Sequence, residues 1–218
     1  MNHLFFFIKG LLVALLCSLP LLAEEKLPAG ASKLPNGDLL VAGITVRRQA
    51  KELAFPGAFK QEAGALEVII AHPHGRVHET LLTTEIKAIQ LQTMLYLLGA
   101  QNGARLPGGK VPQGTLVDIF LEWTDQEGKL HRRPVEDWIL DRRTNQPMKP
   151  IGWTFVGSTI KQGAFLADSE GNVALNYSVG ETVLDLPDPK SQEDDELHTI
   201  NTAQAQPQNI TIVFKPRL

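Results

Sequence analysis

The feature that most constrains this fold is a series of short apolar runs, each long enough for one strand and bounded by glycine, proline or acidic residues. Their β-branched and aromatic side chains favour strands. We expect strands at residues 39–46, 65–71, 115–124, 129–140, 151–158, 164–167, 172–175 and 210–214. The acidic, glycine-ended turn at residues 125–128 predicts that the two runs beside it form a hairpin.

One stretch has a helical period instead. Apolar or small side chains recur there every three to four positions, as Ile86, Ile89, Thr93, Met94, Leu97 and Leu98,. Thr83 or Thr84 can cap the start of this helix, and Gly99 stands where a left-handed C-cap residue belongs. The sequence therefore predicts one principal helix at about residues 84–98.

Two further stretches show neither period. Residues 51–64 contain Phe55, Pro56 and Gly57 in succession, which is typical of an irregular loop,. Residues 187–197 are mostly Asp, Glu, Pro and Gln, which predicts an exposed, mobile loop,. With about seven strands and one strong helix, we expect a single α+β domain with a mainly antiparallel or mixed sheet.

The N-terminal segment has the layout of a signal peptide. Lys9 is followed by an uncharged apolar run, and Ala23 offers the small residue that a signal peptidase requires,. We expect a signal peptide at residues 1–23, a linker at 24–37 and the domain at 38–218. The protein is then exported to the periplasm or the extracellular space, and it meets a membrane only through this leader if the leader stays uncleaved. An uncleaved anchor and a lipoprotein attached at Cys17 are the alternatives.

Composition excludes several classes of function. Cys17 is the single cysteine, so cleavage leaves a domain that can form neither a disulfide nor a thiolate metal site,. The formal net charge is −3, without a long basic run, which argues against a nucleic-acid partner,. An envelope protein or a small ligand remains as the expected partner.

Reactive side chains are concentrated at His72, His74, His78 and Glu79. Imidazole and carboxylate groups suit a divalent metal, so a metal-binding protein or metal-dependent enzyme is one interpretation. It requires at least three of the six side chains His72, His74, His78, Glu79, His131 and His198 to converge within coordination distance. A ligand or partner surface is a second interpretation. In the third, His78 and Glu79 only organise the turn before the helix, with Glu79 near its positive end.

Several landmarks follow one another in a recognisable order. They are residues 75–82, the helix end at 95–100, Glu122 and Trp123, Trp138, residues 153–158 and the turn at 167–171. This series resembles the YdjY-like domain proteins, exported bacterial proteins frequent in planctomycetes, over roughly residues 68–186. The resemblance supports the expected fold and location. It implies no reaction, because the family has no agreed activity.

These observations favour a non-enzymatic envelope domain that binds a ligand or a partner, with no cofactor. Only His78 and Glu79 of the polar cluster belong to the series that resembles the family. Trp153 and Ser158 belong to its Trp-x-Phe-x-Gly-Ser strand, although bulky aromatic residues in strands more often pack in a core. The predicted ligand-binding residues are therefore His74, His78, Glu79, Trp153 and Ser158.

Overall fold

The computed structural model describes residues 30–106, 110–178, 180–193 and 195–218, and these residues form a single body. The protein is mainly β, with a mixed eight-stranded barrel, additional strands and one helix of seven residues or more. Around the barrel, neighbouring strands pair in the order β4 (Glu52–Phe59), β17 (Ile210–Pro216), β7 (Leu116–Thr124), β11 (Trp153–Phe155), β15 (Leu184–Asp185), β14 (Asn172–Leu175), β5 (Val68–Ala71) and β6 (Thr80–Thr83).

A short pairing between β4 and β6 closes the barrel. Ala58 lies opposite Thr83, and Phe59 lies opposite Leu82. The pairs β5–β6 and β14–β15 are parallel and the other barrel pairs are antiparallel. The prediction of a mixed sheet with one principal helix is confirmed. The closure into a barrel is not foreseen by the sequence pattern, and it makes the protein mainly β rather than evenly α+β.

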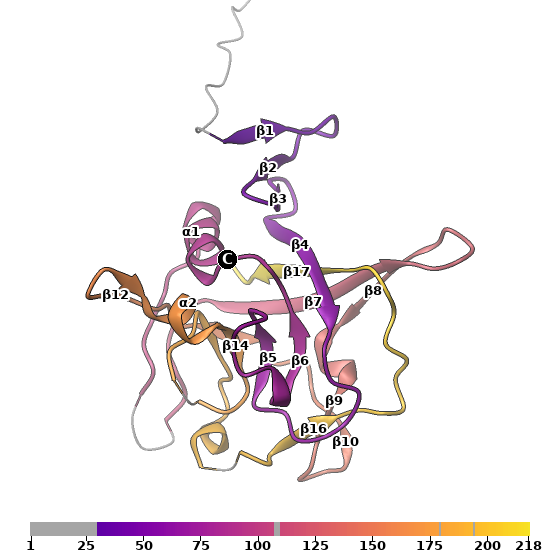
Figure 1. Cartoon of the computed structure of the whole chain (residues 1–218), viewed down its shortest axis with the longest axis vertical. Helices are drawn as coiled ribbons and strands as arrows, with labels where there is room; N and C mark the ends of the chain where they lie inside the picture. Colours follow the sequence, from indigo (N-terminus) through magenta and orange to yellow (C-terminus); the bar gives the residue numbers. More distant parts are fainter. Residues whose placement is uncertain (1–29, 107–109, 179, 194) are drawn as a thin grey trace, which may run out of the picture.

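The additional strands extend the barrel on different sides. β1 (Ala31–Lys33), β2 (Leu39–Val41) and β3 (Ile44–Arg47) continue the sheet from β4 and project beyond one end of the barrel (Figure 1). β8 (Leu130–Pro134) pairs with β7, as the predicted hairpin requires. β9 (Ile139–Asp141), β10 (Gln146–Pro147) and β16 (His198–Ile200) form a separate sheet, and β12 (Ile160–Lys161) pairs with β13 (Ala164–Phe165).

The principal helix, α1, spans Ala88–Leu98 and so begins a few residues later than expected. Its start is stabilised from another element, because the Asp168 carboxylate accepts a hydrogen bond from Ala88 N at 2.6 Å. Gly99 ends the helix with a φ of 98°, as the sequence predicts,. The shorter helices are α2 (Leu166–Glu170) and the 3-10 turns η1 (Val77–Glu79), η2 (Val135–Trp138) and η3 (Pro189–Gln192).

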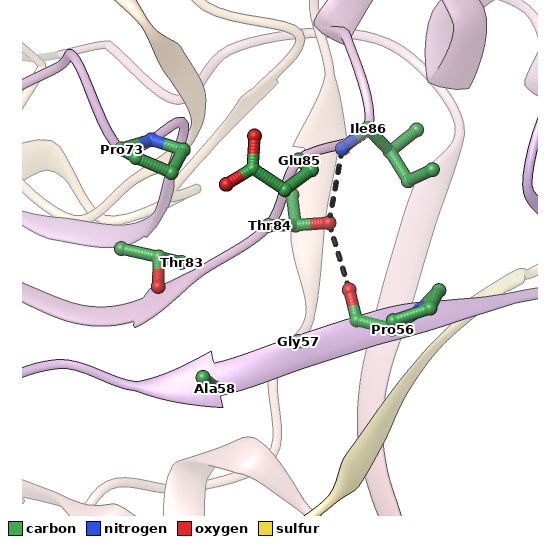
Figure 2. A pocket seen from close by; sticks show the side chains of 8 residues that line it. All are labelled: Pro56, Gly57, Ala58, Pro73, Thr83, Thr84, Glu85 and Ile86. Carbon is green, nitrogen blue, oxygen red and sulfur yellow. Dashed lines mark hydrogen bonds between the residues drawn. The ribbon is translucent and has the colours of Figure 1, made fainter.

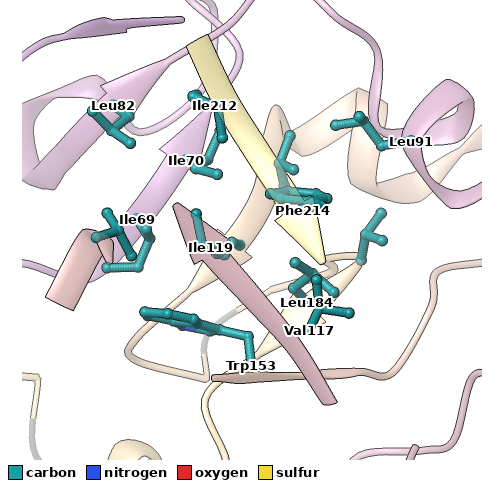
Figure 3. Packing of buried hydrophobic residues seen from close by; sticks show 14 of the residues in the cluster. Ile69, Ile70, Leu82, Leu91, Val117, Ile119, Trp153, Leu184, Ile212 and Phe214 are labelled. Atoms are coloured by element: carbon teal, nitrogen blue, oxygen red, sulfur yellow. The ribbon is translucent and has the colours of Figure 1, made fainter. Parts of the chain in front are cut away.

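The barrel interior and the inner face of α1 form one hydrophobic core. Side chains from several strands and from α1 converge on it (Figure 3), and they include Ile70, Leu91, Ile119, Trp153 and Phe214. Leu91, Trp153 and Phe214 are fully buried. Closure leaves the eight barrel strands without a free edge, so their backbone groups are paired all the way round.

Two predicted loops have a different structure. Residues 51–64 include strand β4, which lies in the middle of the sheet despite Pro56 and Gly57. Gly57 lets β17 pack closely there, because a Cβ atom on it would lie 2.4 Å from Cδ1 of the Ile212 side chain. The predicted loop at residues 187–197 contains η3, and Ser191 and Leu197 within it are buried. It is therefore packed against the body rather than fully exposed.

The N-terminal predictions fall partly outside the described residues. The predicted signal peptide, residues 1–23, lies wholly outside them. Of the predicted linker, residues 24–37, the part at Ala31–Lys33 forms strand β1. No helix within the described residues has the length and apolar character needed to cross a membrane.

Candidate functional site

His72 and His74 follow β5 and face each other. Their Nδ1 atoms are 2.6 Å apart, and His74 Nε2 is 2.9 Å from the Asp168 carbonyl oxygen on α2. A carbonyl oxygen only accepts, so the proton of neutral His74 must lie on Nε2. His74 Nδ1 then accepts a hydrogen bond from His72 Nδ1. Both ring nitrogens of His74 are thus used to hold the loop against α2.

His78 and Glu79 lie on η1, away from this pair. The His78 side chain is 75% exposed and its Nε2 is 3.6 Å from a Glu79 carboxylate oxygen. Glu79 is also hydrogen-bonded to Glu67, where burial and then the Glu79 charge raise the pKa of the Glu67 carboxyl. Strand β6 separates η1 from α1, and Asp168 supplies the carboxylate at the helix start. Glu79 therefore does not have the helix-stabilising position considered from the sequence.

The predicted metal site requires at least three ligands to converge. His72 and His74 meet, but His131 is hydrogen-bonded to Asp125 at 2.5 Å on the β7–β8 hairpin, and His198 lies on β16. Across the described residues, no group of three His, Cys, Asp or Glu side chains is placed to hold a metal ion. The convergence that the metal interpretation needs is therefore not present there.

A small hollow of about 200 Å³ lies beside the histidine pair (Figure 2). Its lining is mostly apolar and consists of Pro56, Gly57, Ala58, Pro73, Thr83, Thr84, Glu85 and Ile86. The Thr84 hydroxyl donates to Pro56 O at 2.8 Å and accepts from Ile86 N at 3.3 Å. Because this hydroxyl already has partners within the protein, the hollow offers few directional contacts to a ligand.

Trp153 and Ser158 have different environments, although they lie close together in the sequence. Trp153 is fully buried, and its indole nitrogen donates to Asn176 Oδ1 at 3.2 Å inside the core. It therefore does not line a surface that a ligand can reach. Ser158 lies on the loop after β11 and lines a polar cleft.

This cleft, which we call the Ser158 cleft, has a volume of about 290 Å³. Three segments from different parts of the chain form it: the loop after α1, the loop after β11 and the residues before β15. Its lining residues are Asn102, Gly103, Ala104, Arg105, Val156, Gly157, Ser158, Thr159, Glu181 and Thr182. Most of its side chains carry oxygen or nitrogen, in contrast to the hollow beside the histidines.

Glycine residues allow the cleft walls to meet closely. Gly103 N donates to Phe155 O at 2.9 Å, and a Cβ atom on Gly103 would lie 1.5 Å from Gln113 O. Gly114 has a φ of +144°, and a Cβ atom there would lie 2.2 Å from Phe155 O. Only glycine fits these contacts. The loop that carries Arg105 is thereby fixed against the end of β11.

Arg105 forms one side of the cleft and is anchored to buried groups. Its Nε donates to Asp185 Oδ2 at 2.7 Å, and its Nη1 donates to Gly180 O. Asp185 is fully buried and also accepts from the Ser178 hydroxyl at 2.9 Å. Burial raises the pKa of the Asp185 carboxyl, and the neighbouring Arg105 charge opposes that rise. Arg105 and Asp185 thus form a neutralised pair behind the cleft.

Glu181 forms the opposite side and is held through its backbone. Its N donates to Glu170 Oε2 at 2.9 Å, and its carbonyl accepts from Asn172 Nδ2 at 3.2 Å. Its carboxylate accepts from the Ser158 hydroxyl at 3.2 Å through Oε2. Ser158 Oγ in turn accepts from Ala167 N at 3.1 Å, so α2 fixes the serine.

Several polar atoms of the cleft have no partner within the described residues. They are the Glu181 carboxylate oxygen that Ser158 does not bind, the Asn102 Oδ1 atom, and the buried Arg105 Nη2. Two of these are acceptors and the third is a donor. Arg105 Nη2 is enclosed by protein atoms, so the oxygens of Glu181 and Asn102 are the groups that a ligand in the cleft can pair with in an already fixed frame.

The sequence identifies only one residue of this cleft, Ser158. Arg105 and Asp185 are 80 positions apart, and nothing in a single sequence links them. Arg105 also lies in a glycine- and proline-rich stretch that predicts only a loop. The one sequence signal for the cleft is the Trp-x-Phe-x-Gly-Ser segment, whose last residue lines it.

Comparison with known proteins returned no match: no family model, curated protein or solved structure matches this chain. The resemblance to YdjY-like domains therefore stays a prediction from the sequence.

Proposed function

We propose that this protein is an exported, non-enzymatic binding module that takes a small polar ligand in the Ser158 cleft. The observation that carries the proposal is the pair of free acceptor atoms on Asn102 and Glu181, which border one cleft together with the exposed Thr159 hydroxyl. Glu181 is half-buried, and a half-buried polar group at a cleft is normally paired with protein, water or a ligand,.

The rigidity of the cleft supports the same proposal. Arg105 is anchored at two groups, Glu181 is fixed through both of its backbone polar atoms, and Ser158 is held from α2. A pre-organised site loses little conformational entropy when it binds, so more of the contact energy appears as affinity. The hollow beside the histidines lacks this combination of fixed and unpaired groups.

The test is a ligand-observed NMR screen of small polar metabolites against the wild-type protein. We expect at least one compound to bind, and Glu181→Ala to abolish its saturation-transfer signal because the variant removes the carboxylate but leaves the backbone contacts. Glu85→Ala is the matched control, since Glu85 lies at the apolar hollow and its side chain is 83% exposed. A compound that binds Glu181→Ala as well as wild type, or that is lost in Glu85→Ala, places binding elsewhere.

A further inference from the structure

We infer that the ligand of the Ser158 cleft is a saccharide, whose hydroxyl groups pair with the cleft and whose ring rests against Tyr96. This inference depends on the proposed function, because it names the chemical class of ligand for the same site. It draws on three properties: the free hydrogen-bonding groups of the cleft, the charge of the cleft, and an exposed aromatic ring beside it.

Hydroxyl groups match the unpaired atoms of the cleft. Glu181 and Asn102 present acceptor oxygens that no other group in the described residues occupies. The Thr159 side chain is exposed at the same cleft and adds a hydroxyl that can either donate or accept a hydrogen bond. A hydroxyl both donates and accepts, so a ligand with several hydroxyls satisfies acceptors and donors at once.

The charge of the cleft disfavours an anionic ligand. The Arg105 charge is already balanced by the buried Asp185 carboxylate, with 2.7 Å between the paired atoms. The Glu181 carboxylate receives only the Ser158 hydroxyl and has no cationic partner in the described residues. A ligand carboxylate or phosphate would therefore meet an uncompensated negative charge. A neutral polyol avoids this repulsion and still binds Glu181 through its hydroxyls.

Tyr96 supplies an aromatic surface next to the cleft. Gln92, one helical turn before it, holds Ser158 from α1: Gln92 Nε2 donates to Ser158 O at 3.0 Å, and Ser158 N donates to Gln92 Oε1 at 2.8 Å. Residues four apart share a helix face, so Tyr96 also faces the loop after β11. Its ring centroid is 5.1 Å from that of the buried Phe155, yet Tyr96 remains 44% exposed.

An exposed tyrosine fixed on a buried ring suits a sugar. The carbon-bound hydrogens of a sugar ring form an apolar face, and a tyrosine combines an apolar ring with a polar hydroxyl. The α1 helix and strand β12 lie on the same side of the barrel (Figure 1). The cleft volume of about 290 Å³ is at the small end of ligand sites, which suits a single sugar ring better than a longer segment,.

The experiment uses the full-length protein with two sets of probes. One set is common hexoses and N-acetylhexosamines as free monosaccharides, and the other is oligosaccharides of the same units. Binding is followed by saturation-transfer NMR and quantified by titration. We expect at least one sugar to bind, with affinity reduced about tenfold or more in Glu181→Ala and in Tyr96→Ala. Leu97→Ala is the matched control, because Leu97 is the next residue on α1, is 70% exposed and points about a quarter-turn away,.

Each outcome decides between the two claims. Sugar binding that depends on both Glu181 and Tyr96 but not on Leu97 supports the inference, and tighter binding of oligosaccharides identifies a sugar chain as the source. If only amines or other non-sugar metabolites bind in a Glu181-dependent way, the saccharide inference is wrong while the proposed function stands. If no sugar binds, the saccharide inference is wrong, and if no compound of the metabolite screen binds either, the proposed function is wrong as well. Unchanged circular dichroism spectra and melting temperatures exclude misfolding of the variants as the cause.

Discussion

A buried carboxyl group on η2 should make the protein less stable as the pH rises. Glu136 is 2% exposed, and its carboxyl oxygen Oε1 accepts a hydrogen bond from Gly152 N at the long distance of 3.4 Å. Burial, together with the nearby carboxylates of Asp118 and Asp137, raises the pKa of Glu136 from 4.5 to about 7. The folded protein therefore keeps this group protonated over a pH range in which the unfolded chain ionises it.

The size of the effect follows from the shift in pKa. Each pKa unit corresponds to about 1.4 kcal/mol, so the shift from 4.5 to about 7 costs about 3 kcal/mol when the group is fully ionised in both states,. The folded-state pKa is raised, so the stability is fully present below the unfolded pKa and declines as the pH rises to about 7. Between pH 5 and pH 8.5 the expected loss is about 2 to 3 kcal/mol.

Glu136→Gln removes the ionisation and keeps the acceptor for Gly152 N. We expect the stability of the variant relative to wild type, measured as the difference in free energy of unfolding, to be about 2 to 3 kcal/mol greater at pH 8.5 than at pH 5. Urea unfolding followed by tryptophan fluorescence at the two pH values measures this difference. Any constant cost of the extra amide N–H cancels in the comparison.

The control is Glu127→Gln, which removes the same charge in the exposed turn between β7 and β8. It should show no comparable dependence on pH. If the stability difference between Glu136→Gln and wild type is the same at both pH values, or grows toward acid, then desolvation of Glu136 does not govern its ionisation and the reasoning is refuted.

Three further predictions concern the frame of the cleft. Arg105→Ala leaves the buried Asp185 carboxylate without its cation. It should destabilise the fold by about 3 kcal/mol in chemical unfolding, with a smaller loss of stability at acid pH. An equal loss in the double variant, in which Asp185→Asn is combined with Arg105→Ala, would contradict this account. Gly103→Ala places a Cβ atom against the Gln113 carbonyl, so it should lower the free energy of unfolding by about 3 kcal/mol and abolish ligand binding,. The control Gly128→Ala, which has open space around it, should leave ligand binding intact. Asp168→Ala removes the acceptor for Ala88 N and should lower the free energy of unfolding by about 1 kcal/mol,. Amide hydrogen exchange should become faster only in the first turn of α1. A uniform acceleration of exchange across the barrel would argue against a capping role.

The sequence predicts those elements whose signals are local. The helix end at Gly99 and the β7–β8 hairpin depend on residues within a few positions of one another, and both are found. Strand β4 is missed because Pro56 and Gly57 are local turn signals, which here are overridden by packing against Ile212 on a distant strand. Closure of the barrel is also missed, because it depends on pairing between β4 and β6, and no local pattern in the sequence signals that pairing.

The candidate site likewise contains residues that a local sequence pattern signals and residues that it does not. Ser158 lies in a segment with a recognisable pattern, and it does line a cleft. The histidines are conspicuous in the sequence, but His72 and His74 are occupied with each other and with α2. Arg105 and Glu181 have no local signal, because their environment is created by contacts with Asp185 and Glu170, which depend on the fold.

The position of β17 has a consequence for the order in which the chain can fold. This strand, at residues 210–216, lies between β4 and β7 and forms its ladders with both. Until those residues are available, β4 and β7 have no neighbour between them, and the apolar side of each stays uncovered. Pairing across such long sequence separations is slow. A chain that is still being synthesised therefore cannot close its barrel before residues 210–216 are available.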